Sequence, residues 1–299
     1  MEPLKTFITQ QQSRNASLLQ QALADANISR HANAAENTLL QAMRYSLLDG
    51  GKRIRPVLCC AAAEAVAKIT PATEAFAAAL ECIHAYSLVH DDLPAMDDDH
   101  LRRGKATCHI AFGEASAILA GDALQCLAFE LAVNAPIEPE HAVKAVQIIA
   151  TAAGATGMVL GQAIDLASVD KTPSLAQMQL MHQHKTGALI EAAVVLGGLS
   201  AYASEQQLAQ LKLYAQAIGL AFQVQDDILD VTSDTETLGK QQGADAERNK
   251  PTYVTLLGLE AAQQKAQELV LQALAAIAEF GDGAIHLRNL AHYIINRDH

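Results

Sequence analysis

The sequence contains no tryptophan, and aromatic residues make up only 4% of its 299 positions. Proline is also scarce, with eight residues, whereas alanine, leucine and glutamine are abundant. This composition favours helices over sheets. Helical periodicity recurs along the chain, and no run of alternating β-branched residues competes with it. We therefore expect an all-α protein that is long enough to bury a substantial core.

Positive charge is also in short supply. The 21 Lys and Arg residues face 33 Asp and Glu residues, which gives a formal net charge of −12. Without a basic surface to release counterions, nucleic acid is not expected as a partner. The five cysteines form no C-x-x-C pair, and Cys59 and Cys60 are adjacent, so they cannot readily bridge to each other. Such thiols are typical of a reducing compartment.

Long uninterrupted apolar runs are missing. Glu64 interrupts the stretch 57–68, and Asp122 and Glu130 interrupt 115–133. A membrane-spanning helix needs roughly 18 apolar residues in succession. The N-terminal residues MEPLKTFITQQQ show neither an apolar segment nor a cleavage pattern of a secretory signal. We expect a soluble, cytoplasmic protein without an integral membrane segment.

No linker-like tract divides the chain, so we expect a single domain over residues 1–299. The periodicity predicts helices bounded by Gly- and Pro-containing turns, over 4–25, 34–49, 54–68, 72–92, 107–133, 138–166, 174–198, 204–230, 250–279 and 283–296. The longest polar segment, 231–250, is predicted to be a surface loop. Long loops inside compact helical domains are usually functional, so a lid is the natural interpretation.

Two aspartate clusters stand out, HDDLPAMDDD at 90–99 and DDILD at 226–230. Each lies at the polar end of an apolar helical stretch. Closely spaced carboxylates repel one another, so a helix gains nothing from them unless a cation is present. Hard oxygen ligands suit Mg²⁺, which commonly shares its coordination with a substrate phosphate. The two clusters together therefore indicate a metal-bridged diphosphate.

In the second cluster, Asp226 and Asp227 lie four and three residues before Asp230, and Gln223 lies one turn earlier. A solvated acidic helix end is the alternative interpretation. Acidic groups at a helix C-terminus face the unfavourable end of the macrodipole, which argues against it. The preceding apolar run, 218–224, also points into a core.

In the first cluster, Pro94 should end the helix near Asp92, so that a loop carries Asp97 back toward Asp91 and Asp92. Arg102 and Arg103 follow directly. They could bind phosphate oxygens bidentately, or Arg102 could form a local salt bridge with Asp98.

Basic residues also cluster in GGKRIRP at 50–56, where a glycine pair and three cations precede a helix and suit an anion. An ordinary solvated turn is the alternative. His84, on the helix before the first cluster, is either a satisfied core residue or a donor to a phosphate. Lys185-Thr186-Gly187 and Gly239-Lys240 are weak signals when taken individually.

Five motifs occur in order: GGKRIRP at 50–56, HDDLPAMDDD with RRG at 90–104, HKTG at 184–187, FQVQDDILD at 222–230, and LGKQQGAD with NKPTY at 238–253. In this order and spacing they resemble the trans-isoprenyl diphosphate synthases, and within that family the bacterial farnesyl diphosphate synthase group. The resemblance runs from about residue 47 to residue 253. It implies an all-α helical bundle around a deep central cavity, usually in a homodimer.

The resemblance also implies roles for individual residues. Three Mg²⁺ ions would be held against the allylic diphosphate by the two aspartate motifs, Asp91, Asp92, Asp97, Asp226, Asp227 and Asp230. The same diphosphate would be contacted by Arg102, Lys185, Thr186, Gln223 and Lys240. Isopentenyl diphosphate, the nucleophilic substrate, would be held by Gly51, Lys52, Arg55, His84 and Arg103. The family often places basic residues at the extreme C-terminus. Apart from a terminal histidine, Arg297 is the basic residue of that segment here.

By the same resemblance, Tyr86 and Ser87 line the cavity where the growing chain points, and Tyr86 is its floor at fifteen carbons. Products of ten or twenty carbons are the alternatives. A metal-dependent phosphohydrolase built on His84 and the pair His90-Asp91 is a remote alternative, because it leaves the second cluster and GGKRIRP without a role. A non-catalytic partner subunit should carry a damaged aspartate motif, whereas both motifs are intact here.

Overall fold

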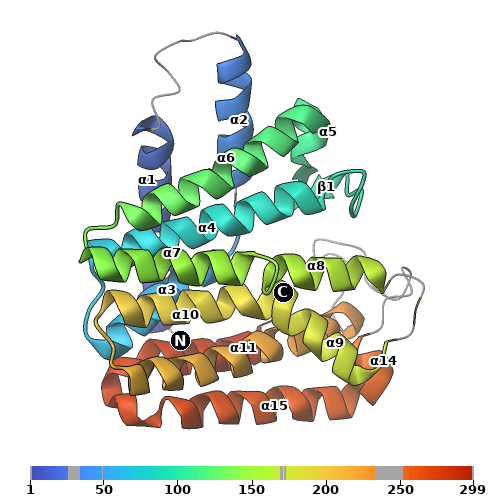
Figure 1. Ribbon diagram of the computed structural model, residues 1–299. Coiled ribbons are helices and arrows are strands. Elements are labelled where there is room, and N and C mark those ends of the chain that lie inside the picture. Colours follow the sequence, from blue (N-terminus) through green and yellow to red (C-terminus); the bar gives the residue numbers. More distant parts are fainter. Residues whose placement is uncertain are drawn as a thin grey trace.

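A computed structural model describes residues 2–25, 34–48, 50–168, 171, 173–232 and 252–297. Within these ranges every regular element is a helix except for one short hairpin (Figure 1). The predicted all-α class is therefore confirmed. Residues 233–250 of the expected lid, including Lys240, lie outside the described residues.

The elements of the first part of the chain are α1 Glu2–Asp25, α2 Ala34–Leu48, α3 Ile54–Val66, α4 Pro71–Asp91, the antiparallel strands β1 Leu101–Arg102 and β2 Lys105–Ala106, α5 Cys108–Phe112, α6 Glu114–Val133, α7 Pro139–Ala153 and α8 Met158–Ala167. The second part contains α9 Leu175–His182, a π-helical turn Gln183–Gly187, α10 Ala188–Ser200, α11 Glu205–Thr232, α14 Tyr253–Leu257, α15 Leu259–Ala276, a 3₁₀ segment Ala278–Ala284 and α16 Ile285–Asn296.

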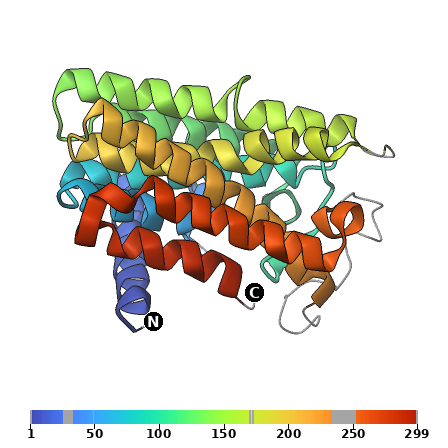
Figure 2. The same cartoon turned by 90° about the horizontal axis from the view of Figure 1, so that it is seen from below.

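The core lies around α3, α4 and α10, in which most side chains are buried. In the view of Figure 1, helices α4, α7, α10, α11 and α15 run across the molecule in successive rows. Seen from below, α15 and α16 cover one side of the bundle, and the chain ends near them (Figure 2). Helix α4 packs against α3 and α6, and α11 packs against α10 and α15. Small side chains allow this close packing.

Helix α4 shows how local sequence sets the position of the first aspartate cluster. Thr70 caps its start reciprocally with Thr73, and Pro71 occupies the first helical position, where its missing N–H costs nothing. The helix ends at Asp91, close to the predicted end, because Pro94 follows. Asp91 and Asp92 are therefore presented at the C-terminal end of a long buried helix.

Several predicted helices are interrupted. The helix expected over 107–133 breaks at Gly113, and the one expected over 250–279 breaks at Gly258, where φ is +86° and +85°. The helix expected over 138–166 breaks between α7 and α8, and the one over 174–198 contains the π-helical turn. The hairpin β1–β2 was not predicted, because strands of two residues leave no periodic pattern.

Two helical stretches of the described chain are long and apolar enough to cross a membrane, namely α6 and Pro139–Ala167, each with a window of mean hydropathy 1.5. The bent pair α15–α16 would add a third if it counted as one span. This finding rests on length and composition and tolerates the charges that interrupt these stretches, so the expected lack of an integral membrane segment stays a prediction. Helix α6 nevertheless packs along α4 and α2, with Ala117, Ala120 and Ala128 fully buried.

Candidate active site

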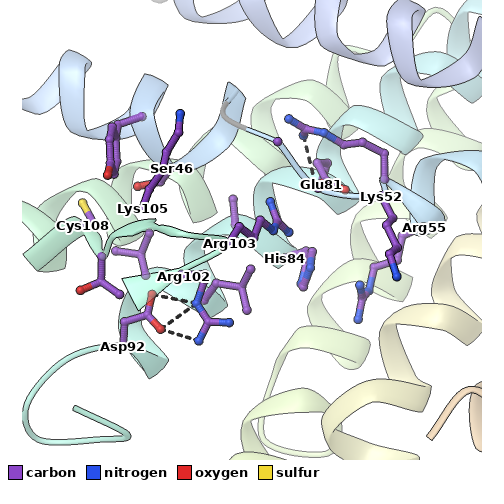
Figure 3. A pocket seen from close by; sticks show the side chains of 18 of the residues that line it. Ser46, Lys52, Arg55, Glu81, His84, Asp92, Arg102, Arg103, Lys105 and Cys108 are labelled. Carbon is purple, nitrogen blue, oxygen red and sulfur yellow. Dashed lines mark hydrogen bonds and ion pairs between the residues drawn. The ribbon is translucent and has the colours of Figure 1, made fainter. Parts of the chain in front are cut away.

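A cavity of about 550 Å³ opens between the end of α2, the turn before α3, one face of α4, the hairpin and α11 (Figure 3). Its lining is strongly basic. The cationic side chains in it are Lys52, Arg53, Arg55, Arg102, Arg103 and Lys105. Glu81 and Asp92 are the carboxylates that line it. In a chain of net charge −12, this concentration of positive charge marks an anion-binding site.

The basic turn 50–55, which runs into the first two residues of α3, forms one wall of this cavity. Gly50 and Gly51 have positive φ values of 80° and 95°, which favour glycine. A Cβ atom on Gly51 would also lie only 2.5 Å from Nη1 of Arg103. The glycine therefore lets the hairpin arginine lie against the turn. Predicted substrate ligands from two distant motifs, Gly51, Lys52 and Arg103, thus share one cavity.

Arg55 and His84 contribute from neighbouring helices. The Nε atom of Arg55 is buried and has no hydrogen-bond partner among the described residues. Burial lowers the pKa of His84 well below its ordinary value, and the nearby charges of Arg55 and Arg103 lower it further. His84 is therefore neutral near pH 7 and can donate one N–H to an oxygen. It lines the cavity, and the interpretation of it as a mere core residue is not favoured.

Asp92 and Arg102 form a bidentate pair at the cavity edge. The Arg102 Nε donates to both carboxylate oxygens of Asp92, at 2.7 and 2.9 Å, and Arg102 also lies 3.6 Å from Asp99. The alternative pairing with Asp98 is not found; Asp98 is exposed and lies 4.0 Å from His100. Arg102 thus ties the hairpin to the end of α4, on the side that faces the basic turn.

Asp91 lies outside the lining of this cavity. Burial raises its pKa to about 6; the charge of Lys185 opposes that shift, and Asp97 adds to it. The Asp97 backbone N–H donates to the Asp91 carbonyl at 2.9 Å, which folds the loop back onto the helix end. The predicted approach of Asp97 to Asp91 is therefore present, while Asp92 is held by Arg102.

Lys185 and Thr186 lie in the π-helical turn, a feature that often occurs at functional sites. A Cβ atom on Gly161 of α8 would lie 2.0 Å from the Lys185 backbone nitrogen, so glycine allows α8 to approach this turn. The Lys185 Nζ contacts Asp165 of α8 at 2.7 Å. Asp165 was missed in the sequence. Its signal was GQAID at 161–165, an acidic residue one turn after a Gly-Gln pair in an apolar stretch.

The second aspartate cluster lies near the end of α11. The Asp226 carboxylate is about half exposed and accepts from the buried guanidinium of Arg297, which also donates to the Phe222 carbonyl at 3.1 Å. Asp227 is buried and accepts from the Tyr253 N–H at 2.6 Å, at the start of α14. Asp230 is also buried, with 2% of its surface exposed. Of the three carboxylates, Asp226 is the most accessible.

The second cluster also lies near the basic turn. Phe222, one turn before Asp226, lines the cavity, and the charges of Arg297 and Asp226 both act on the pKa of Lys52, which burial lowers. Gln223 follows Phe222 and is partly buried. The fold thus brings α11 against a turn that lies about 170 residues away in sequence.

No three carboxylate, imidazole or thiol groups within the described ranges lie close enough together to bind a metal ion by themselves. The available donors nevertheless suit Mg²⁺. They are hard carboxylate oxygens beside an anion cavity, and burial disfavours the charge of Asp91 unless a cation approaches. Mg²⁺ is usually held by one or two carboxylates together with substrate phosphates. A site completed by the substrate fits this arrangement.

The two residues predicted to set product length are buried. Tyr86 is 5% exposed, and its ring lies edge-to-face against His90 at a centroid distance of 5.8 Å. The Ser87 hydroxyl donates to the His84 carbonyl at 2.9 Å. Neither residue lines the 550 Å³ cavity, so their role in product length stays a prediction.

Similarity to characterised families agrees with this geometry. The sequence profile described as polyprenyl synthetase matches residues 36–282. The chain belongs to the polyprenyl synthetase family. The farnesyl diphosphate synthase of Haemophilus influenzae is 52% identical over 262 residues, which covers 87% of this chain and 88% of that protein. The chloroplastic geranylgeranyl pyrophosphate synthase 11 of Arabidopsis thaliana is 47% identical, over 87% of this chain and 75% of that protein.

A solved structure of an FPP/GFPP synthase from Zymomonas mobilis superposes with a TM-score of 0.86 at 39% identity, covering 98% of this chain and 99% of that one. The polyprenyl synthetase assignment confirms the resemblance drawn from the five motifs and the prenyltransferase class that it implied. The phosphohydrolase alternative finds no support in it.

Proposed function

We propose that this polyprenyl synthetase is a Mg²⁺-dependent farnesyl diphosphate synthase. It condenses isopentenyl diphosphate first with dimethylallyl diphosphate and then with geranyl diphosphate, releasing diphosphate each time. The observation that carries the proposal is the basic cavity beside two carboxylate clusters in an otherwise acidic chain. The relative from Haemophilus influenzae, which carries that name at 52% identity, supports the fifteen-carbon product over the twenty-carbon alternative.

In this proposal the cavity receives the diphosphate of isopentenyl diphosphate. Lys52, Arg55 and Arg103 supply positive charge, Gly51 allows the close approach of Arg103, and neutral His84 donates one hydrogen bond. Arginine forks match phosphate oxygens bidentately. The five-carbon chain then lies along the apolar part of the lining, toward α4.

The allylic diphosphate is proposed to bind between the two aspartate clusters. Its metal ligands would be Asp91, Asp92, Asp97, Asp226, Asp227 and Asp230, and Arg102, Lys185, Thr186, Gln223 and Lys240 would contact it directly. When bound, Mg²⁺ stabilises the negative charge that develops on the leaving diphosphate. Asp226 needs the smallest rearrangement to act as a ligand, because it is the most accessible carboxylate of its cluster.

The chain's own residues then have two tasks. The cations hold both diphosphates so that the double bond of isopentenyl diphosphate lies against the allylic carbon as its C–O bond breaks. The buried apolar helices keep water from the allylic cation. A proton leaves the adduct to form the new double bond, and the departing diphosphate is proposed to accept it.

The proposal is tested by incubating the protein with isopentenyl diphosphate and each allylic diphosphate in turn, with Mg²⁺ and after chelation. We expect a fifteen-carbon product from dimethylallyl and geranyl diphosphate, and none after chelation. A ten- or twenty-carbon product would replace the farnesyl assignment with the corresponding alternative. Full activity in chelator, or phosphate release without isopentenyl diphosphate, would reject the proposal.

We also propose a homodimer in the cytoplasm. Helices α5 and α6 carry the exposed apolar side chains Ile110, Ile118 and Leu119, which are 51%, 43% and 57% exposed. A second copy covering this face would bury them. Leu119→Glu is expected to give monomers in light scattering, whereas Leu213→Glu, at an equally exposed position on α11, should leave the dimer intact. The free cysteines suit a reducing compartment.

A further inference from the structure

A buried ion pair supports the basic turn from behind. The Arg53 Nη1 lies 3.1 Å from Oε1 of Glu81 on α4, and the two side chains are only 6% and 5% exposed. The other guanidinium nitrogen, Nη2, donates to the Leu47 carbonyl in the last turn of α2. Arg53 therefore joins three segments, namely the end of α2, the turn 50–55 and the middle of α4.

The backbone at Arg53 needs such support. Its φ of 49° places a non-glycine residue in the left-handed region, directly after two glycines with positive φ. Side chains rarely adopt this conformation unless the surrounding structure holds it. Lys52 and Arg55 flank this residue, so the direction in which they enter the cavity depends on how Arg53 is held.

Glu81 has a second, electrostatic effect. Its negative charge raises the pKa values of both Arg55 and Arg103, opposing the desolvation that lowers them. Figure 3 shows Glu81 in the cavity with the labelled Lys52, Arg55, Arg103 and His84. Cations gathered without a substrate repel one another, and a buried carboxylate among them offsets part of that repulsion. Asp92, the other lining carboxylate, is engaged by Arg102.

We infer that Glu81 and Arg53 are positioning residues for the diphosphate of isopentenyl diphosphate. Neither is proposed to touch the substrate; they act through Lys52, Arg55 and Arg103 by fixing the turn and balancing its charge. This inference rests on the proposed function for the identity of the ligand. The anion site itself does not depend on that function.

The first test is Glu81→Gln, which keeps the shape of the side chain and removes its charge. We expect the KM for isopentenyl diphosphate to rise about tenfold, which is the effect of losing one charge-assisted hydrogen bond between the protein and this substrate. The KM for geranyl diphosphate should change less than about threefold, because that substrate is held elsewhere. Equal increases in both values, or no increase for isopentenyl diphosphate, would overturn the inference.

The second test separates positioning from folding. In Arg53→Met/Glu81→Leu both charges are replaced by apolar groups, which often preserves stability where loss of one partner does not. Circular dichroism melting should show that the double variant folds, with a modest loss of stability from the missing hydrogen bond to the Leu47 carbonyl, while its affinity for isopentenyl diphosphate stays reduced. A stable double variant with wild-type affinity would show that the pair is structural only.

The matched control is Glu74→Gln. Glu74 lies on the same helix and also pairs with an arginine, Arg14, but this pair is more exposed and neither residue lines the cavity. It should leave both KM values unchanged. Calorimetric titration with isopentenyl diphosphate, and separately with inorganic pyrophosphate, measures the affinity without turnover. If the wild type binds these anions but makes no product, the proposed function fails while the inference about Glu81 and Arg53 is still decided.

Discussion

The carboxylate of Asp91 should destabilise the folded protein in the absence of metal. Burial at the end of α4 raises its pKa to about 6, although Lys185 opposes the shift. In the unfolded chain an aspartate titrates near 3.9. The folded state therefore binds more protons between about pH 4 and pH 6, so the ionised carboxylate opposes folding fully above pH 6 and not at all below pH 4.

The size of this effect follows from the shift. Two pKa units correspond to about 3 kcal/mol, which is an upper value because the carboxyl retains some contact with water. Asp91→Asn removes the charge and keeps the shape. At pH 8 in chelator we expect its free energy of unfolding to exceed that of the wild type by roughly 1–3 kcal/mol, and at pH 4 the two should coincide. The same variant should lose synthase activity by about 100-fold.

Urea titrations at pH 8 and pH 4, followed by circular dichroism, measure this difference. Asp98→Asn is the control, because Asp98 lies in the loop that follows α4 and is 59% exposed, and it should change the free energy of unfolding by less than about 0.5 kcal/mol at either pH. A gain of equal size at both pH values would attribute the effect to packing rather than to charge. A loss of stability at pH 8 would refute the reasoning, since it would mean that the carboxylate is stabilised by partners stronger than its burial.

Three further predictions concern other parts of the site. Tyr86→Ala should lengthen the product toward twenty carbons or more in chromatography of dephosphorylated products; an unchanged fifteen-carbon product would remove Tyr86 from this role. Lys185→Met should raise the KM for the allylic substrate about tenfold and leave that for isopentenyl diphosphate nearly unchanged, and steady-state kinetics with the opposite pattern would contradict the proposed arrangement. Arg297→Met removes a charged hydrogen bond to Asp226 and a cation over the Phe222 ring at 4.0 Å, which should lower the free energy of unfolding by about 2–3 kcal/mol and the Tm by roughly 5 °C. Calorimetric scans measure this shift in Tm. Arg14→Met, which breaks an exposed pair, is the control and should leave the Tm unchanged in the same scans.

The end of α4 separates two regions of the site. Asp92 lies on the side of the basic turn, held by Arg102, whereas the charges that act most strongly on Asp91 are those of Lys185 and Asp97. Adjacent residues on a helix point about 100° apart, so Asp91 and Asp92 meet different neighbouring charges.

The hairpin and the π-helical turn are features that local sequence patterns do not predict. The segment RRG at 102–104 predicts phosphate ligands, but its two-residue strands and the pairing of Arg102 with Asp92 rather than Asp98 depend on how the loop folds back. Likewise, HKTG was visible as a motif, while its π-helical geometry and its contact with Asp165 depend on α8 packing against it at Gly161.

The all-α class, the positions of most helices and the motifs that assign the family can be predicted from the sequence, because helical periodicity, prolines, caps and charged clusters are local signals. Which charges meet depends on the packing of distant segments. In the sequence, Glu81 is one acidic residue in an alanine-rich helix and Arg297 is an unassigned residue near the chain end. Only the fold shows that Glu81 pairs with Arg53 and that Arg297 pairs with Asp226. Partners separated by 28 and 71 residues are chosen by the way helices pack, and no local pattern records that choice.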